Sequence, residues 1–158
     1  MLRVSDIMVR SVLLFARATP LSEALRALVD ADVSGAPVCE ADGRVIGVIA
    51  KSDLAELSLG GAAREAVGDL MSSDVISAKA GEALGVAIER MVFEGVHRLI
   101  VIDDEGRLVG IMTASDVLRA IAEGRATLRA AEAPASVRHP REVGERTGPG
   151  TPSSSTDS

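Results

Sequence analysis

The chain repeats itself at a constant offset of 63 residues. Val4–Met8 returns as Val67–Met71, and Gly47–Asp53 returns as Gly110–Asp116, with no gap between the two alignments. Self-similarity of this kind indicates a duplicated structural unit, and it constrains the architecture more than any local pattern does. Units of roughly 60 residues are only marginally stable alone because they bury too little surface. We therefore expect the two units to pack on each other and to create paired clefts between them.

The composition excludes several classes of function. Phe15 and Phe93 are the only aromatic residues among 158, and the net charge is -6, so stacking on nucleic-acid bases and binding to a phosphate backbone are disfavoured. No apolar run approaches ~18 residues, and no long hydrophobic stretch follows the N-terminus, so we expect a cytoplasmic protein without a membrane span. The single cysteine, Cys39, lies in an apolar run and is predicted to be a small core residue.

The order of predicted elements is the same in both units. The first has a strand at 12–15, a helix with Thr19 as N-cap and Pro20 as its first residue, a hairpin over 36–50 and a helix over 52–57. The second has a strand at 75–76, a helix, strands at 99–102 and 108–112, and a helix ending near 122. The spacing predicts buried helical faces that comprise Leu21, Ala24, Leu25, Leu28 and Val29, and Leu84, Ala87, Ile88, Met91 and Val92.

These elements predict an α/β (α+β) protein built from two strand-helix-strand-strand-helix units. The units span residues 4–57 and 67–122, and a linker of small residues at 58–66 joins them. Residues 123–158 have little apolar content and are predicted to form a disordered tail. We expect the two units to be related by a pseudo-twofold axis.

Each unit resembles a CBS motif, the cystathionine β-synthase type of regulatory domain, and the pair resembles a Bateman module. The resemblance covers about residues 4–122. It rests on Asp-(Ile/Leu)-Met at 6–8 and 69–71, on the order of elements, and on the glycine-led segments 47–53 and 110–116 that end in Ser-Asp. It implies an adenosine ligand in the inter-unit cleft, a homodimer, and signalling to a regulated protein that the sequence does not identify.

The resemblance also implies site residues. Asp116 would accept hydrogen bonds from ribose hydroxyls, and Thr113 would touch ribose or phosphate, with Ser115 beside them. Helix N-terminal amides near these side chains favour an anion. The alternative is that Asp116 only caps the last helix.

His97 and Arg98 form the second informative motif, which is similar to the His-Arg strand entry in the gamma subunits of AMP-activated protein kinases. A guanidinium presents a planar donor fork to phosphate oxygens, so we predict that Arg98, assisted by His97, meets the nucleotide phosphate. The alternative is a surface arginine paired with a carboxylate and a solvated histidine.

The first unit departs from this pattern. Ala50 stands where the second unit has Thr113, and Ser34 and Gly35 replace the His-Arg pair, while Ser52 and Asp53 remain. We therefore predict one competent cleft at Asp116 and a degenerate one at Asp53. Residues near the first strands would contact adenine, which assigns Val75, Ile76 and Ser77 to the Asp116 cleft and residues 12–15 to the Asp53 cleft.

We predict a regulatory module that binds AMP, ADP, ATP or S-adenosylmethionine. The alternative is a structural dimerisation module without a small-molecule ligand. An enzyme is disfavoured, because the chain has no Ser-His-Asp order, no His/Cys metal spacing and no Walker-type loop. The acidic triplet 103–105 could hold Mg²⁺, but it falls at a hairpin turn, where solvated carboxylates are common. We predict no metal site.

Overall fold

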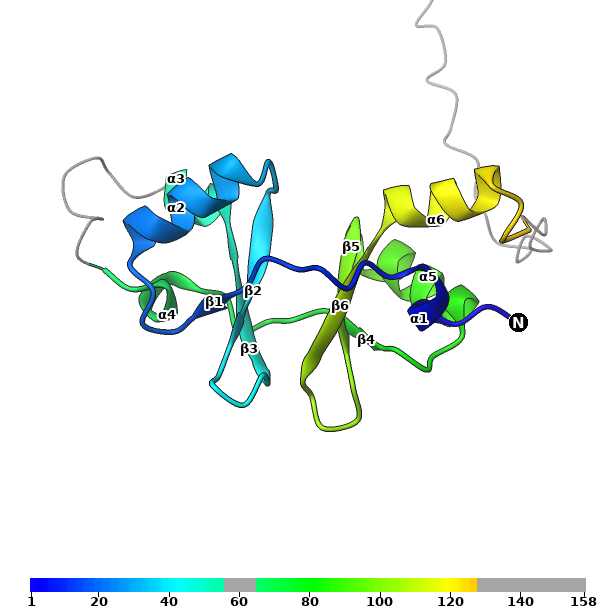
Figure 1. The fold of residues 1–158 in the computed structure, drawn as a ribbon, viewed down its shortest axis with the longest axis horizontal. Coiled ribbons are helices and arrows are strands. Elements are labelled where there is room, and N and C mark those ends of the chain that lie inside the picture. The colour runs from blue at the N-terminus through cyan, green and yellow to red at the C-terminus, as the bar shows by residue number, and fades with distance from the viewer. Residues whose placement is uncertain (56–64, 128–158) are drawn as a thin grey trace, which may run out of the picture. The chain divides into compact units, whose positions relative to one another are not determined.

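The computed structural model describes residues 1–55 and 65–127 (Figure 1). Most of the predicted linker and the predicted tail from 128 onward lie outside these residues. The first repeat comprises β1 (Phe15–Ala16), α2 (Leu21–Asp30), β2 (Gly35–Cys39), β3 (Val45–Ala50) and α3 (Lys51–Ala55). The second comprises β4 (Ser77–Lys79), α5 (Leu84–Glu94), β5 (Arg98–Ile102), β6 (Leu108–Thr113) and α6 (Ala114–Ala122). Each repeat begins with a short helix, α1 (Val4–Ile7) in the first and α4 (Val67–Leu70) in the second.

The two repeats form two three-stranded sheets with the same topology, so the predicted α+β class is confirmed. In each sheet the first strand pairs parallel to the second, and the second pairs antiparallel to the third. The registers match at the 63-residue offset, since Val38 faces Gly47 in one sheet and Val101 faces Gly110 in the other. Both hairpins also shift register after these residues.

Contacts between the repeats obey a pseudo-twofold axis. Met1–Thr127 is one structural unit. Within it Val9 pairs with Ile111 of the second repeat, and the equivalent Ser72 pairs with Val48 of the first. The hairpin turns meet reciprocally as well: the Val45 amide donates to the Gly106 carbonyl at 3.1 Å, and the equivalent Leu108 amide donates to the Gly43 carbonyl at 2.9 Å. Each such contact is therefore made twice, as twofold packing requires.

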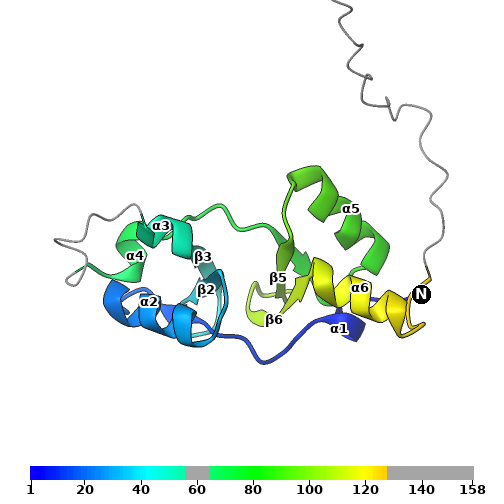
Figure 2. The same cartoon turned by 90° about the horizontal axis from the view of Figure 1, so that it is seen from above.

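The two short helices are exchanged between the cores. α1 packs in the core of the second repeat, and α4 packs in the core of the first. The Val4 amide donates to the Glu82 carbonyl at 3.0 Å, and the equivalent Val67 amide donates to the Thr19 carbonyl at 2.8 Å. Figures 1 and 2 show α1 beside α6 and α4 beside the first sheet. Residues 9–13 and 72–76 consequently cross from one core to the other.

This exchange explains why the first strand of each repeat begins later in the chain than predicted. The predicted strands at 12–15 and 75–76 lie mainly in the crossing segments, and β1 and β4 begin only at Phe15 and Ser77. Repeated glycines allow the crossings. A Cβ on Gly110 would lie 2.8 Å from the Val9 carbonyl oxygen, and one on Gly47 would lie 2.8 Å from that of Ser72.

Two local predictions about α2 and α5 were wrong. Pro20, not Thr19, is the N-cap of α2, because the Thr19 hydroxyl instead accepts a hydrogen bond from the Ala16 amide at 3.2 Å. The buried helical stripe is also narrower than predicted. Val29 and Val92 are 57% and 77% exposed, and Leu25 is 43% exposed. The buried stripes comprise Leu21, Ala24 and Leu28 in α2 and Leu84, Ala87 and Met91 in α5.

The chain makes local contacts just after α6. The Arg125 amide donates to the Ala120 carbonyl at 2.8 Å, and Ala126 is partly buried against the second core. Cys39 is buried as predicted, and burial raises the pKa of its thiol. None of the helices in 1–55 and 65–127 has the length and apolarity needed to cross a bilayer.

Candidate functional site

Two neighbouring pockets lie between the repeats. The Asp116 pocket, of about 440 Å³, has one wall from the crossing segment 9–13 and from residues 32–35, and another from β6 and α6. The Ala50 pocket, of about 220 Å³, has its walls from β2, β3, β5 and the crossing segment that holds Asp74 and Ile76. Each pocket therefore combines residues of both repeats, which neither repeat could supply alone.

Asp116 lines the Asp116 pocket and also takes part in the capping box of α6, in which Thr113 is the N-cap. Its Oδ2 accepts hydrogen bonds from the Thr113 amide at 2.8 Å and from the Thr113 hydroxyl at 2.9 Å, while its own amide donates to that hydroxyl at 3.2 Å. The side chain is 9% exposed. Its Oδ1 forms an ion pair with Arg119 at 3.8 Å, and the Arg119 side chain is 66% exposed. Capping and ligand binding are thus compatible, because they can use different carboxylate oxygens.

Arg98 lies next to Thr113 and crosses to the other repeat. The β5–β6 register places these two residues opposite each other. The Arg98 guanidinium donates to the Ser34 hydroxyl and, at 3.4 Å, to the Gly35 carbonyl. Ser34 and Gly35 are the repeat counterparts of His97 and Arg98, so this contact lies where the pseudo-twofold axis brings equivalent positions together. The structure thus places Arg98, Thr113 and Asp116 on one pocket.

The remaining predicted residues of the second repeat lie elsewhere. His97 is exposed and borders an apolar groove between α5 and α6, so the solvated alternative describes it better than a place beside Arg98 in the Asp116 pocket. Ser115 is exposed and does not line the Asp116 pocket. Ile76 lines the Ala50 pocket, Val75 is half-buried beside it in the chain, and Ser77 lines a third pocket.

The crossing segments line the two pockets in the opposite arrangement to the one the sequence suggested. Residues 9–13 line the Asp116 pocket, whereas Ile76 lines the Ala50 pocket. The prediction assumed that each repeat's first strand lies beside its own last helix. The exchange of α1 and α4 brings each crossing segment to the third strand of the opposite repeat instead. The constant 63-residue offset of the repeat does not show whether a short helix packs in its own core or in the other one.

The first repeat supplies fewer polar groups than the second, and Asp53 is not among the residues that line the Ala50 pocket. The Asp53 Oδ2 accepts a hydrogen bond from the Ala50 amide at 2.9 Å, which repeats the capping geometry of Asp116. Ala50 contributes no hydroxyl, and Ser52 is exposed. The wall of the Ala50 pocket is mainly aliphatic, with Asp74 and Arg98 as its charged members.

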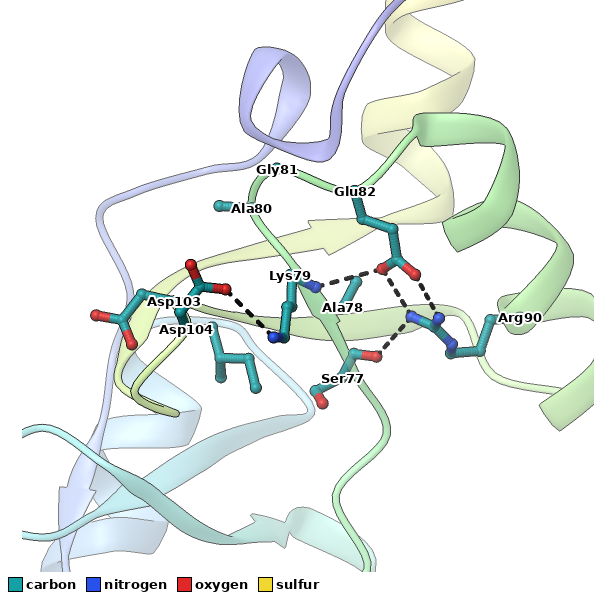
Figure 3. Close-up of a pocket in the computed structure, with 10 residues that line it drawn as sticks. Ser77, Ala78, Lys79, Ala80, Gly81, Glu82, Arg90, Asp103 and Asp104 are labelled. Carbon is teal, nitrogen blue, oxygen red and sulfur yellow. Dashed lines mark hydrogen bonds and ion pairs between the residues drawn. The ribbon is translucent and has the colours of Figure 1, made fainter.

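The third pocket, of about 740 Å³, is wide but its charged groups are already paired (Figure 3). Arg90 donates through Nη2 to Glu82, and through Nη1 to both the second Glu82 oxygen at 2.8 Å and the Ser77 carbonyl at 2.9 Å. The Arg90 hydrogen bonds lower the pKa of Glu82. Lys79 contacts Asp104 at 3.2 Å. This network holds the β4–α5 connection against α5, and sequence reasoning did not single it out.

The acidic triplet at 103–105 lies in the hairpin turn, where the carboxylate of Asp103 stabilises the turn. The Asp103 carboxylate accepts hydrogen bonds from the amides of Glu105 at 3.0 Å and Arg107 at 2.8 Å. Across the described part of the chain, no group of three or more His, Cys, Asp or Glu side chains could hold a metal ion.

Comparison with known proteins identifies the family. The profile of the CBS domain family matches residues 4–60 and 67–123. The chain therefore belongs to the CBS domain family and carries two tandem copies of the domain.

Solved structures of CBS pairs share this fold. The crystal structure of CBSX2 in complex with AMP superposes with a TM-score of 0.71 at 28% identity, covering 78% of this chain and 98% of that one. The CBS-pair protein CBSX2 from Arabidopsis thaliana gives 0.70 at 26% identity, covering 79% and 98%.

Curated relatives match over a small part of their own length. The gamma-3 subunit of 5'-AMP-activated protein kinase from Homo sapiens is 34% identical over 113 residues, which cover 65% of this chain and 23% of the subunit. Inosine-5'-monophosphate dehydrogenase from Methanocaldococcus jannaschii is 28% identical over 117 residues, covering 74% and 23%. This chain thus spans about a quarter of these relatives.

Proposed function

We propose that this chain is a regulatory module that binds an adenine nucleotide or a related adenosyl ligand in the Asp116 pocket. The observation that carries the proposal is the convergence of Asp116, Thr113 and Arg98 on one pocket opposite residues 9–13. A carboxylate suits ribose hydroxyls, and a guanidinium suits phosphate. The AMP complex of CBSX2, which is 28% identical, supports this class of ligand.

The exchange of short helices provides a route for signalling. Residues 9–13 lead from α1, in the second core, to β1 in the first, and they form one wall of the Asp116 pocket. A ligand that contacts this wall and α6 favours whichever arrangement of the repeats it binds better. The shift in population is then passed to a protein partner. We propose that the chain regulates its partner and does not itself catalyse a reaction. We also propose that it acts in the cytoplasm, where free nucleotides occur.

Thermal shift across a ligand panel tests the proposal. AMP, ADP, ATP and S-adenosylmethionine should be compared with GMP and GTP on the full chain. A ligand at 100 times its Kd stabilises the folded state by about 2.7 kcal/mol, so at least one adenine ligand should raise the Tm by several degrees. No shift with any adenine ligand would contradict the proposal and favour the structural alternative.

We also infer that two copies of this chain associate through α2, α5 and α6. Val29 and Val92 occupy equivalent positions in the two repeats, and both are exposed. An apolar groove of about 380 Å³ continues this surface between α5 and α6, where Leu118 is 65% exposed. Because the pseudo-twofold axis relates Val29 of the first repeat to Val92 of the second, a second copy of the chain can cover both valines with equivalent contacts.

Light scattering tests the dimer. The parent should show about twice the 16.3 kDa mass of one chain. The Val92→Glu variant should be monomeric, because it buries a charge in an apolar interface. Glu94→Ala, an exposed position on another side of the same helix, should remain dimeric. A monomeric parent at concentrations of tens of micromolar would refute the inferred dimer.

A further inference from the structure

Arg98 is shared by the two pockets between the repeats. The Asp116 pocket and the Ala50 pocket have a common wall that comprises Ser34, Gly35, Arg98 and Ile111. Arg98 reaches this wall from the second repeat and is held there by Ser34 and the Gly35 carbonyl. Arg98 therefore lines both ligand spaces, with its guanidinium against the residues of the common wall.

Among the described residues that line either pocket, Arg98 is the only one with a positively charged side chain. The Asp116 pocket adds Asp32 and Asp116, and the Ala50 pocket adds Asp74. Three carboxylates thus face one guanidinium across the pair. Arg98 is therefore the positive charge that attracts a phosphate group in either pocket. Once one phosphate has bound, the charge of Arg98 is neutralised and attracts a second phosphate less.

The repeat explains why there is one such cation and not two. The counterpart of Arg98 is Gly35, and a Cβ there would lie 2.8 Å from the Ile49 carbonyl oxygen. The backbone of the first repeat therefore leaves no space for a side chain at this position. The Arg98 side chain occupies the axis where a symmetric pair would place two arginines against each other.

We propose that the two pockets compete for Arg98, so that the chain binds one phosphate-bearing adenosine ligand at a time. This inference rests on the proposed adenosine-binding function and adds the coupling between its two pockets. A phosphate in one pocket weakens binding of a second phosphate in the other on the order of tenfold or more, because like charges repel across a thin wall with one shared counter-charge. Adenosine, which carries no phosphate, fills both pockets without this penalty.

Isothermal titration with AMP and with adenosine tests the coupling. For the parent chain we expect one AMP per chain before any weaker phase, and two adenosines per chain. Arg98→Ala should bind AMP roughly 10- to 100-fold more weakly, near the affinity for adenosine, since it loses a charge-assisted hydrogen bond. Arg107→Ala, an exposed arginine at the other end of the same hairpin, should match the parent.

The Ser34→Ala variant tests the charge of Arg98 independently of its hydrogen bond to Ser34 in the other repeat. It removes the hydroxyl that holds Arg98 but keeps the guanidinium, so one AMP per chain is still expected. Arg98→Lys, which keeps a cation at this position, should also retain one AMP per chain if the alanine variant does not fold.

Other outcomes would overturn the inference. Two equal and independent AMP sites in the parent would show that Arg98 does not couple the pockets. A single adenosine per chain would show that only one pocket accepts the ligand, so that no second pocket competes for Arg98. Binding of neither ligand would instead contradict the proposed function itself.

Discussion

Replacing Asp116 with alanine should weaken adenine-nucleotide binding roughly 10- to 150-fold. The variant loses a charge-assisted hydrogen bond of about 1.5 to 3 kcal/mol to the ribose. It should also lose about 0.5 to 2 kcal/mol of stability, because Oδ2 caps α6 through the amide and hydroxyl of Thr113. Titration calorimetry measures the first effect, and urea unfolding measures the second.

Asp69→Ala is the matched control for this experiment. The Asp69 carboxylate accepts a hydrogen bond from the Ala66 amide at 3.1 Å, so it makes the same local capping contact outside the Asp116 pocket. This variant should lose some stability and keep the parent affinity. If Asp116→Ala bound the nucleotide as tightly as the parent, the assignment of the pocket would be wrong, and capping would account for this carboxylate.

Gly110→Ala should destabilise the fold by about 1 to 3 kcal/mol, the usual cost of overpacking a tight contact. Its Cβ would approach the Val9 carbonyl oxygen to 2.8 Å and the Met8 sulfur to 2.9 Å. It would therefore strain the hydrogen bonds between Val9 and Ile111, at 2.8 and 2.9 Å, that join the crossing segment to β6. Urea unfolding should show a lower midpoint with an unchanged slope.

Two other glycines make this test specific. Gly47→Ala should be destabilising to a similar degree, because its Cβ would meet Met71 and Ser72 in the equivalent crossing. Gly85→Ala should instead stabilise the protein by about 0.5 to 1 kcal/mol, since this α5 glycine has no neighbour within 4 Å of an added Cβ. A Gly110→Ala variant as stable as the parent would show that the crossing is not tightly packed in solution.

Much of the architecture was predictable because it depends on short-range pattern. The repeat, the order of elements and the two hairpins follow from spacing and turn residues such as Gly43 and Gly106, both of which have positive φ. The candidate site was predictable for Asp116, Thr113 and Arg98, which lie close together through one hairpin and the helix that follows it. His97 was not, because it lies in the bend before β5, which begins at Arg98, and borders the groove between α5 and α6.

The exposed positions Val29 and Val92 illustrate a different limit. Helical spacing alone places them on the edge of a buried stripe, but only the position of neighbouring elements decides whether that edge is covered. In this fold it is open in both repeats, and the openness is what supports the inferred dimer.

The sequence by itself determined that two similar units exist, where their helices and strands lie, and which side chains are available to a ligand. Only the tertiary structure decided that α1 and α4 exchange cores, that residues 9–13 and not 75–77 line the Asp116 pocket, and that Arg98 lies between two pockets. The physical reason is that identical local patterns make either core equally acceptable to a four-residue helix. The choice between them depends on contacts made across about 80 residues of chain, as between Val4 and Glu82, and these contacts leave no periodic trace in the sequence.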